Sequence, residues 1–251
     1  LDNESESDDV INFSEIMEKY EGEYNGSPDP DKVCAIVFTS GTTGFPKGVM
    51  SSHRNFVYSA GSVHVACPTT RMLCCLPIHH SFCFTGNITK SIVKGKTVCV
   101  NDNLANLIQD LQLYKPDSIL AVPQLVKKIM FGAMKFAAAH PELPQEKAIN
   151  SFLGGNIIDI ISGGAPLEAA LNEKFNSTGI LVLNGYGMTE CTPIISNNSV
   201  GNFRHGSVGK PIPCVDAKIV NGEILVKGPN VMLGYYKNPE ATAQKIDADG
   251  W

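Results

Sequence analysis

Hydroxyl side chains and glycines surround a single lysine in residues 39–49, which read Thr-Ser-Gly-Thr-Thr-Gly-Phe-Pro-Lys-Gly-Val. Because glycine lets the backbone turn tightly, peptide N–H groups and neighbouring hydroxyls can converge there on phosphate oxygens. Lys47 would add a positive charge. The spacing therefore predicts a polyphosphate-binding loop formed by Thr39, Ser40, Gly41, Thr42, Thr43, Gly44 and Lys47.

This loop differs from the Walker A loop of kinases and GTPases. The Walker A pattern needs a glycine before the lysine and a hydroxyl after it, whereas Pro46 precedes Lys47 here and Gly48 follows it. A flexible linker is also disfavoured, because residues 33–38 form an apolar, β-branched run directly before the loop. We expect that run to be a strand buried on both faces, with the loop at its carboxyl end.

Two further segments place polar residues directly after predicted strands. Residues 162–166 (Ser-Gly-Gly-Ala-Pro) follow the apolar run 157–161, and residues 184–190 (Asn-Gly-Tyr-Gly-Met-Thr-Glu) follow the run 180–183. Open α/β sheets bind ligands outside the carboxyl ends of their strands. Each segment alone could also be an ordinary turn into a helix, and Pro166 suits the first residue of a helix.

The elements that must position these segments form an alternating pattern. Short apolar strands alternate with helical stretches such as residues 103–114 and 124–140, which is typical of parallel βαβ units. We predict an α/β fold: a mostly parallel sheet, or sheets, flanked by helices and followed by part of a small β subdomain. The predicted strands are 33–38, 71–76, 96–100, 117–122, 157–161 and 180–183, followed after residue 200 by 215–220, 223–227 and 231–236.

The domain organisation follows from the same pattern. We predict an acidic lead-in segment over residues 1–32 with a short amphipathic helix near residues 11–20. An α/β core over residues 33–200 and the start of a β-rich subdomain over residues 201–251 complete the chain.

The polar segments together resemble the adenylate-forming (AMP-binding) superfamily, which includes acyl-CoA synthetases, luciferases and the adenylation domains of peptide synthetases. The amino-acid sequence of residues 162–167 and 185–193 looks most like that of a medium- or long-chain fatty acyl-CoA synthetase. The matching segments follow the order of that family: residues 39–49, 76–80 (Leu-Pro-Ile-His-His), 162–166, 184–190, 222–224 and 234–242.

The resemblance implies a role for each matched residue on the nucleotide. The loop at residues 39–47 would hold the β- and γ-phosphates of ATP, and Glu190 together with Thr39 would bind Mg²⁺. The Tyr186 ring would stack on adenine, and Asn184 would bond the adenine amino group. The remaining residues implied to contact the nucleotide are Gly163, Gly164, Ala165, Gly185, Gly187 and Thr189.

The resemblance also implies the residues nearest the reaction. Thr189 would contact the α-phosphate and the carboxylate, and the Pro-x-x-His pattern starting at Pro77 selects His80 rather than His79 to position the reacting acid. The implied catalytic residues are Lys47, His80, Thr189 and Glu190.

The implied activity is ATP-dependent conversion of a carboxylic acid, a medium- or long-chain fatty acid, to acyl-AMP with release of pyrophosphate. Thioester formation with CoA would follow, which makes the parent an acid-thiol ligase. In this family the thioester step uses a mobile C-terminal domain, and we expect this chain to lack that domain. We also expect it to lack the ribose-binding aspartate, which the family places just after the position of Trp251. We therefore expect a fragment of the large N-terminal domain.

Two alternatives stay open. The first is adenylation of an aryl acid or an amino acid, or acyl transfer to a carrier protein. An amino acid would need an acidic partner for its ammonium group, and none stands out in the sequence beside His80 or Ser162. The second is a non-catalytic module that binds a nucleotide or an acyl-adenylate.

The amino-acid composition indicates which kinds of binding partner to expect. Residues 1–31 hold 11 acidic side chains and one lysine while the whole chain of 251 residues carries −5, so the remainder is mildly basic and would not repel ATP or CoA. The eight cysteines show no paired spacing typical of zinc or redox sites. We predict a cytoplasmic protein with small-molecule substrates, no nucleic-acid partner and no transmembrane segment. The sequence gives no prediction of oligomeric state.

Overall fold

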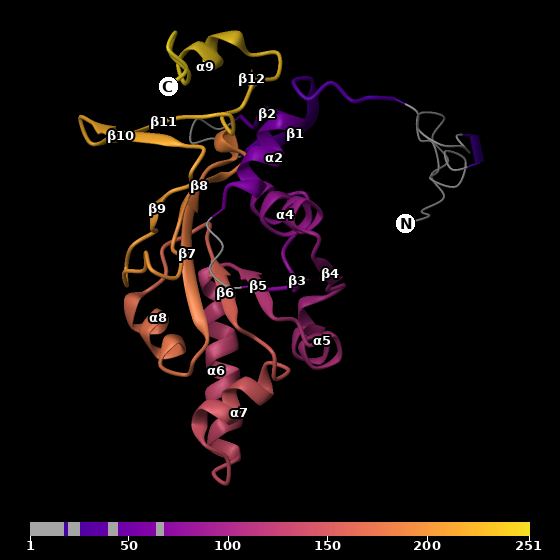
Figure 1. The fold of residues 1–251 in the computed structure, drawn as a ribbon, viewed down its shortest axis with the longest axis vertical. Coiled ribbons are helices and arrows are strands. Elements are labelled where there is room, and N and C mark those ends of the chain that lie inside the picture. The colour runs from indigo at the N-terminus through magenta and orange to yellow at the C-terminus, as the bar shows by residue number, and fades with distance from the viewer. Residues whose placement is uncertain (1–17, 20–25, 40–44, 64–67) are drawn as a thin grey trace.

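A computed structural model describes residues 18–19, 26–39, 45–63 and 68–251 of the chain (Figure 1). Its centre is a seven-stranded sheet with the order β4-β3-β5-β6-β7-β8-β9. The strands from β4 to β7 run parallel, and β8 and β9 continue the sheet antiparallel. The bounds are β3 (Arg71–Cys74), β4 (Thr97–Val100), β5 (Ser118–Ala121), β6 (Asp159–Ser162), β7 (Leu181–Gly187), β8 (Ile194–Asn197) and β9 (Lys210–Pro211).

Helices cover both faces of this sheet, as expected for parallel strands joined by helical crossovers. One face packs against four helices in the main apolar core, which includes Ile119, Ile160, Val182 and Phe175. These helices are α5 (Leu107–Tyr114), preceded by the short η2 (Leu104–Asn106), α6 (Pro123–Ala139), α7 (Gln145–Phe152) and α8 (Ala169–Asn176). The predicted α/β fold with a mostly parallel sheet is therefore confirmed.

A second group of helices lies on the opposite face. The Cys83 Sγ atom lies 3.3 Å from Cys74 Sγ of β3, and Ser91 Oγ donates to Met72 Sδ on the same strand. This group comprises α2 (His53–Gly61), which precedes β3, and three elements that follow one another closely after β3: α3 (Ser81–Cys83), the π-helical turn η1 (Phe84–Thr89) and α4 (Lys90–Lys94).

The strand predicted at residues 33–38 is present, but its predicted burial on both faces is wrong. β1 (Val33–Thr39) pairs antiparallel with β2 (Lys47–Ser52) in a separate three-stranded sheet, not in the main one. It forms an edge of that sheet, and Val33, Ile36 and Phe38 are exposed. The glycine-rich segment therefore connects two antiparallel strands, and residues 40–44 within it lie outside the described residues.

The C-terminal part of the chain contributes to both sheets. β10 (Asp216–Val220) and β11 (Glu223–Lys227), both predicted as strands, form a hairpin that is a separate two-stranded sheet, with Asn221 and Gly222 at positive φ as an Asn-Gly turn requires. β12 (Gly234–Tyr235), shorter than the strand predicted there, pairs with β2 and precedes α9 (Pro239–Ala243). The domain division at residue 200 stays a prediction.

Several element boundaries differ from the predictions. The helix expected to start at Pro166 begins at Ala169, and β8 and β9 were not predicted. The helix predicted near residues 11–20 lies outside the described residues except for Glu18 and Lys19, which are helical. In the part of the chain that the structure describes, no helix combines the length and apolar character needed to cross a membrane.

Candidate functional site

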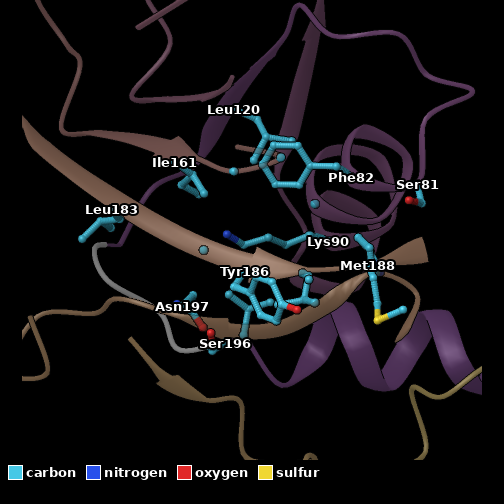
Figure 2. Close-up of a pocket in the computed structure, with 18 of the residues that line it drawn as sticks. Ser81, Phe82, Lys90, Leu120, Ile161, Leu183, Tyr186, Met188, Ser196 and Asn197 are labelled. Atoms are coloured by element: carbon cyan, nitrogen blue, oxygen red, sulfur yellow. The ribbon is translucent and has the colours of Figure 1, made fainter. Parts of the chain in front are cut away.

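A pocket of about 340 Å³ lies between the main sheet and the helical group α3, η1 and α4 (Figure 2). One end of it lies at the carboxyl ends of β6 and β7, where the polar segments predicted from the sequence are found. The predicted site residues that line it come from three separate segments: His80, Gly163, Gly164, Gly185, Tyr186, Gly187, Thr189 and Glu190.

Two of these glycines are required by close packing. A Cβ atom on Gly163 would lie 2.8 Å from the Phe82 ring, which covers the backbone that follows β6. A Cβ atom on Gly187 would lie 1.9 Å from the carbonyl oxygen of Pro193, where β7 meets β8 with a bulge. Larger side chains at either position would displace the pocket wall.

His80 is held in one orientation by the start of α3. Its Nδ1 accepts a hydrogen bond from the Phe82 backbone N–H at 3.2 Å and so caps the helix. Because Nδ1 accepts, the neutral imidazole carries its proton on Nε2, which is left to donate. The neighbouring Ser81 hydroxyl lies 3.1 Å from the Thr189 hydroxyl and links this segment to β7 and η3 (Thr189–Cys191).

Tyr235 connects two predicted catalytic residues. Its ring centroid lies 5.2 Å from the Lys47 ammonium nitrogen, and its hydroxyl donates to Glu190 Oε1 at 2.7 Å. Burial and the neighbouring Glu190 carboxylate raise the pKa of Tyr235, so the phenol stays protonated as a donor. Sequence reasoning assigned Tyr235 no role, although it lies in the matched segment 234–242.

Asn184 and Tyr186 lie on consecutive positions of the same face of β7. The Asn184 Oδ1 atom is buried and has no hydrogen-bond partner among the described residues, and Asn184 does not line the pocket. The Tyr186 side chain is 39% exposed and leaves part of its ring open to stacking.

The remaining predicted residues are distributed unevenly. Thr39 and Lys47 face each other in the β1–β2 register, which brings the two ends of the predicted phosphate loop together. Ala165 is exposed after β6 and, like Asn184, does not line the pocket. Ser40, Gly41, Thr42, Thr43 and Gly44 lie outside the described residues.

A magnesium ion fits this end of the pocket only with ligands from the substrate and water. Among the described residues no group of three His, Cys, Asp or Glu side chains is arranged to hold a metal. Glu190 supplies a carboxylate with one oxygen engaged by Tyr235. Mg²⁺ commonly takes one or two protein carboxylates together with phosphate oxygens and waters, so this donor set is sufficient.

The opposite end of the pocket holds charged residues that the sequence analysis did not single out. Lys90 of α4 and Asp159 of β6 line it and are both buried. Burial, with the neighbouring Lys96, lowers the pKa of Lys90 to about 8, and burial raises the pKa of Asp159. The available signal was an aspartate inside an otherwise apolar strand.

The fold and the pocket together define an α/β protein that binds its ligand at the carboxyl edge of a mostly parallel sheet. Within that class the chain belongs to the AMP-binding enzyme family, whose profile matches residues 2–236.

Two relatives and one solved structure show how similar this chain is to known proteins. The 4-coumarate–CoA ligase-like protein 2 of Arabidopsis thaliana is 33% identical over 240 residues, which cover 88% of this chain and 40% of that protein. The human long-chain-fatty-acid–CoA ligase 1 is 31% identical over 271 residues, covering 89% of this chain and 39% of that protein. The o-succinylbenzoate CoA synthetase of Bacillus subtilis, solved with ATP and magnesium, superimposes with a TM-score of 0.72 at 27% identity, covering 89% of this chain and 46% of that one.

The chain thus spans about 40% of the length of the curated relatives it matches. Those relatives act on different acids by name, so the match does not select one acid.

Proposed function

We propose that the protein activates a carboxylic acid with ATP and Mg²⁺ to give an acyl-adenylate and pyrophosphate, and then transfers the acyl group to CoA. The observation that supports this best is the convergence of His80, Tyr186, Thr189 and Glu190 on one pocket. These residues come from segments far apart in the sequence, and a set of unrelated turns would not bring them together.

ATP and Mg²⁺ are proposed at the carboxyl edge of the sheet. Adenine would lie against Tyr186 and donate its amino group to Asn184 Oδ1, which has no partner among the described residues. The triphosphate would lie toward Lys47 and the predicted loop of residues 39–47. Bound Mg²⁺ would supply charge neutralisation for the phosphates, and Glu190 would hold it.

The acid is proposed in the interior of the pocket, with its carboxylate at the end that lies at the carboxyl ends of β6 and β7. The Nε2–H of His80 and the Thr189 hydroxyl can donate hydrogen bonds that orient a carboxylate oxygen. That oxygen attacks the α-phosphorus of ATP, the bond from this phosphorus to the bridging oxygen breaks, and pyrophosphate leaves. Lys47 would stabilise the charge that develops on the phosphates.

The substrate class is part of the proposal. Leu120, Ile161 and Leu183 form apolar walls next to the glycines, which suits the hydrocarbon part of a medium- or long-chain fatty acid. CoA would attack the acyl-adenylate through its thiol in a second half-reaction of the whole protein. A cytoplasmic location belongs to the same proposal, and the seven described cysteines that are free thiols fit a reducing compartment.

The test is ATP–pyrophosphate exchange with the purified full-length protein against a panel of fatty, aryl and amino acids. We expect exchange that requires both Mg²⁺ and a carboxylic acid, and that fatty acids support. Exchange with amino acids alone would contradict the proposed substrate class. Binding of ATP without exchange in the presence of any acid would contradict the proposed reaction.

A further inference from the structure

The pocket continues along β6 from the glycines to the opposite end of the strand. Side chains two residues apart on a strand share a face, so Asp159, Ile161 and the glycine at position 163 follow one another along one wall. At a strand rise of about 3.3 Å per residue, the wall between positions 159 and 163 is roughly 13 Å long. The pocket is therefore deep enough for an extended acyl group.

The wall that the sheet forms changes from apolar to polar residues along this length. Parallel registers pair Leu120 with Ile161 and Ile161 with Leu183, which gives an apolar row across three strands. One step toward the amino ends of the strands, the register pairs Ser118 with Asp159. An apolar middle thus leads to a polar far end.

The helical wall changes in the same way. Phe82, Gly86 and Lys90 recur every four residues through α3, η1 and α4, and all three line the pocket. The Phe82 ring lies over Gly163, and a Cβ atom on Gly86 would lie 3.3 Å from Leu120. Figure 2 shows Lys90 extended along the pocket, with its nitrogen toward the side where Ile161 and Leu183 lie.

Among the described residues at the far end, Lys90 is the buried charged group without a hydrogen-bond partner. Only 7% of Lys90 is exposed, and its ammonium group hydrogen-bonds none of the described residues and forms an ion pair with none of them. Asp159 interacts with it electrostatically, but the Asp159 carboxylate accepts a hydrogen bond from the Ser118 hydroxyl at 2.5 Å. A buried ammonium without hydrogen bonds is costly unless a ligand supplies them.

We propose that Lys90 binds a second carboxylate at the far end of the acyl group, which narrows the proposed fatty-acid substrates to medium-length fatty acids with a carboxylate at both ends, the α,ω-dicarboxylic acids. This inference rests on the proposed function, because it assumes that the reacting carboxylate lies near His80. The apolar row of Leu120, Ile161 and Leu183 would enclose the hydrocarbon between the two carboxylates. Lys96 adds a second positive charge facing Lys90, which favours an anion over a neutral polar group at that position.

A plain fatty acid is disfavoured by the same geometry. Its terminal methyl group would lie against the ammonium of Lys90 and would give the N–H donors no hydrogen-bond acceptor. A site built to bond a polar group of its substrate rejects an analogue that lacks this group, and we expect a preference of at least about 100-fold.

The experiment is ATP–pyrophosphate exchange by the full-length protein with two series of acids of equal chain length, one monocarboxylic and one dicarboxylic. Higher kcat/KM for the dicarboxylic acids, by about 100-fold, would support the proposal. Equal or better exchange with the monocarboxylic acids would overturn it while leaving the proposed function intact. Absence of exchange with every acid would overturn the proposed function, and this inference with it.

Two substitutions of Lys90 identify the residue responsible. Lys90→Met keeps the length of the side chain without its charge and should lower kcat/KM for dicarboxylic acids while raising it for monocarboxylic acids. Lys90→Arg keeps the charge and should retain the preference for dicarboxylic acids. The matched control is Lys128→Met, at an exposed lysine of α6 that does not line the pocket, which should leave both series unchanged.

A gain with monocarboxylic acids cannot come from a misfolded variant, so this specificity change separates recognition from a purely structural role. If Lys90→Met leaves the ratio between the two series as it is in the unmodified protein, Lys90 does not recognise the acid and the proposal is wrong.

Discussion

The two ends of the pocket are built from different kinds of residue. The end at the carboxyl edge of the sheet consists of glycines, hydroxyls and one carboxylate, held at the end of β7 and in the segments that follow β6 and β7. The far end consists of Lys90 and Asp159, which come from the interior of a helical segment and from the first residue of a strand.

This difference indicates a division of labour. Turns that need glycine leave contiguous patterns in the sequence, and the chemistry common to all substrates of the site can be placed there. A side chain that projects from a helix toward a strand leaves no such pattern and can change without disturbing the turns. We therefore expect substitutions at the carboxyl edge to affect exchange with every acid, and substitutions at the far end to affect the choice of acid.

The largest effect should come from Lys47→Ala. Removing a charge that stabilises the phosphates should lower kcat/KM for exchange by about 100- to 1000-fold. The loss should be the same for each acid tested, because Lys47 lies beside Tyr235 and not in the acyl part of the pocket. The measurement is exchange against both acid series, with thermal unfolding to confirm that the fold is retained.

Lys128→Ala is the matched control, because this exposed lysine lies on α6, outside the residues that line the pocket. Exchange that is unchanged in Lys47→Ala would remove the polyphosphate role of this residue. A loss confined to one class of acid would contradict the expectation that substitutions at the carboxyl edge affect exchange with every acid.

A somewhat smaller effect is expected for Glu190→Gln, which keeps the shape of the side chain and removes its charge. We expect exchange to fall by about 100-fold and the Mg²⁺ concentration required for half-maximal exchange to rise. A magnesium titration of exchange measures both. An unaltered Mg²⁺ requirement would show that Glu190 does not hold the metal.

Tyr235→Phe probes the same contact more gently. It removes only the hydroxyl that donates to Glu190 Oε1 at 2.7 Å, while the ring beside Lys47 is retained. Because a hydrogen bond to a charged group is lost, we expect a decrease of about tenfold in exchange. A loss as large as that of Glu190→Gln would instead assign Tyr235 a direct role in the reaction.

Gly163→Ala tests the junction between the two ends. The added Cβ atom would lie 2.8 Å from the Phe82 ring and would have to displace it into the pocket. Such overpacking should raise KM for the acid by about tenfold with a smaller effect on KM for ATP. Shortening the ring in the double variant Gly163→Ala with Phe82→Leu should restore the KM.

Gly61→Ala supplies the control for that experiment, because the nearest atom to an added Cβ, on Val93, lies 3.8 Å away. It should leave KM for the acid unchanged. If Gly163→Ala behaves like Gly61→Ala, the Phe82 ring does not define the acyl pocket.

The sequence predicted the carboxyl-edge end of the pocket and missed the far end for a physical reason. His80, Gly163, Tyr186 and Glu190 belong to contiguous patterns, so their roles could be proposed before any coordinates were known. Ser118 and Asp159 are 41 residues apart and meet only through the register of β5 and β6. That register follows from the order of strands in the sheet, which local patterns do not define.

The same reason explains the wrong prediction at β1. A continuous apolar run is typical of a strand covered on both faces, and Val33, Ile36 and Phe38 gave that pattern. In the structure β1 pairs with β2 at the edge of a small sheet, and the third strand of that sheet, β12, begins only at Gly234. Whether a strand joins the main sheet or such a small sheet depends on these distant segments and not on its own apolar run. The missed role of Tyr235 has the same origin, since it is 45 residues from Glu190.

The smallest effect expected is the pH dependence of stability that Lys90 causes. Burial, with Lys96, lowers its pKa to about 8 in the folded protein from 10.5, and Asp159 on β6 and Lys94 on the same helix also face it electrostatically. Between these pH values the unfolded chain binds more protons than the folded one, so the free energy of unfolding rises with pH. The contribution amounts to about 1 kcal/mol between pH 7 and 9.

Other groups titrate in the same pH range. The informative quantity is therefore the difference in the free energy of unfolding between the unmodified protein and a variant at each pH. Burial raises the pKa values of Cys75 and Cys191 to about 12, which lowers stability as the pH rises above 9. Subtracting the profile of Lys90→Met removes this contribution, because both thiols are retained. The measurement is chemical denaturation at pH 7, 8 and 9, a range that brackets the folded pKa of about 8. Lys128→Met, at an exposed lysine of α6 outside the pocket, should follow the unmodified protein. Parallel profiles for the protein and Lys90→Met would mean that Lys90 is hydrated or paired in solution, and the far end would then lack the buried ammonium that distinguishes it from the carboxyl edge.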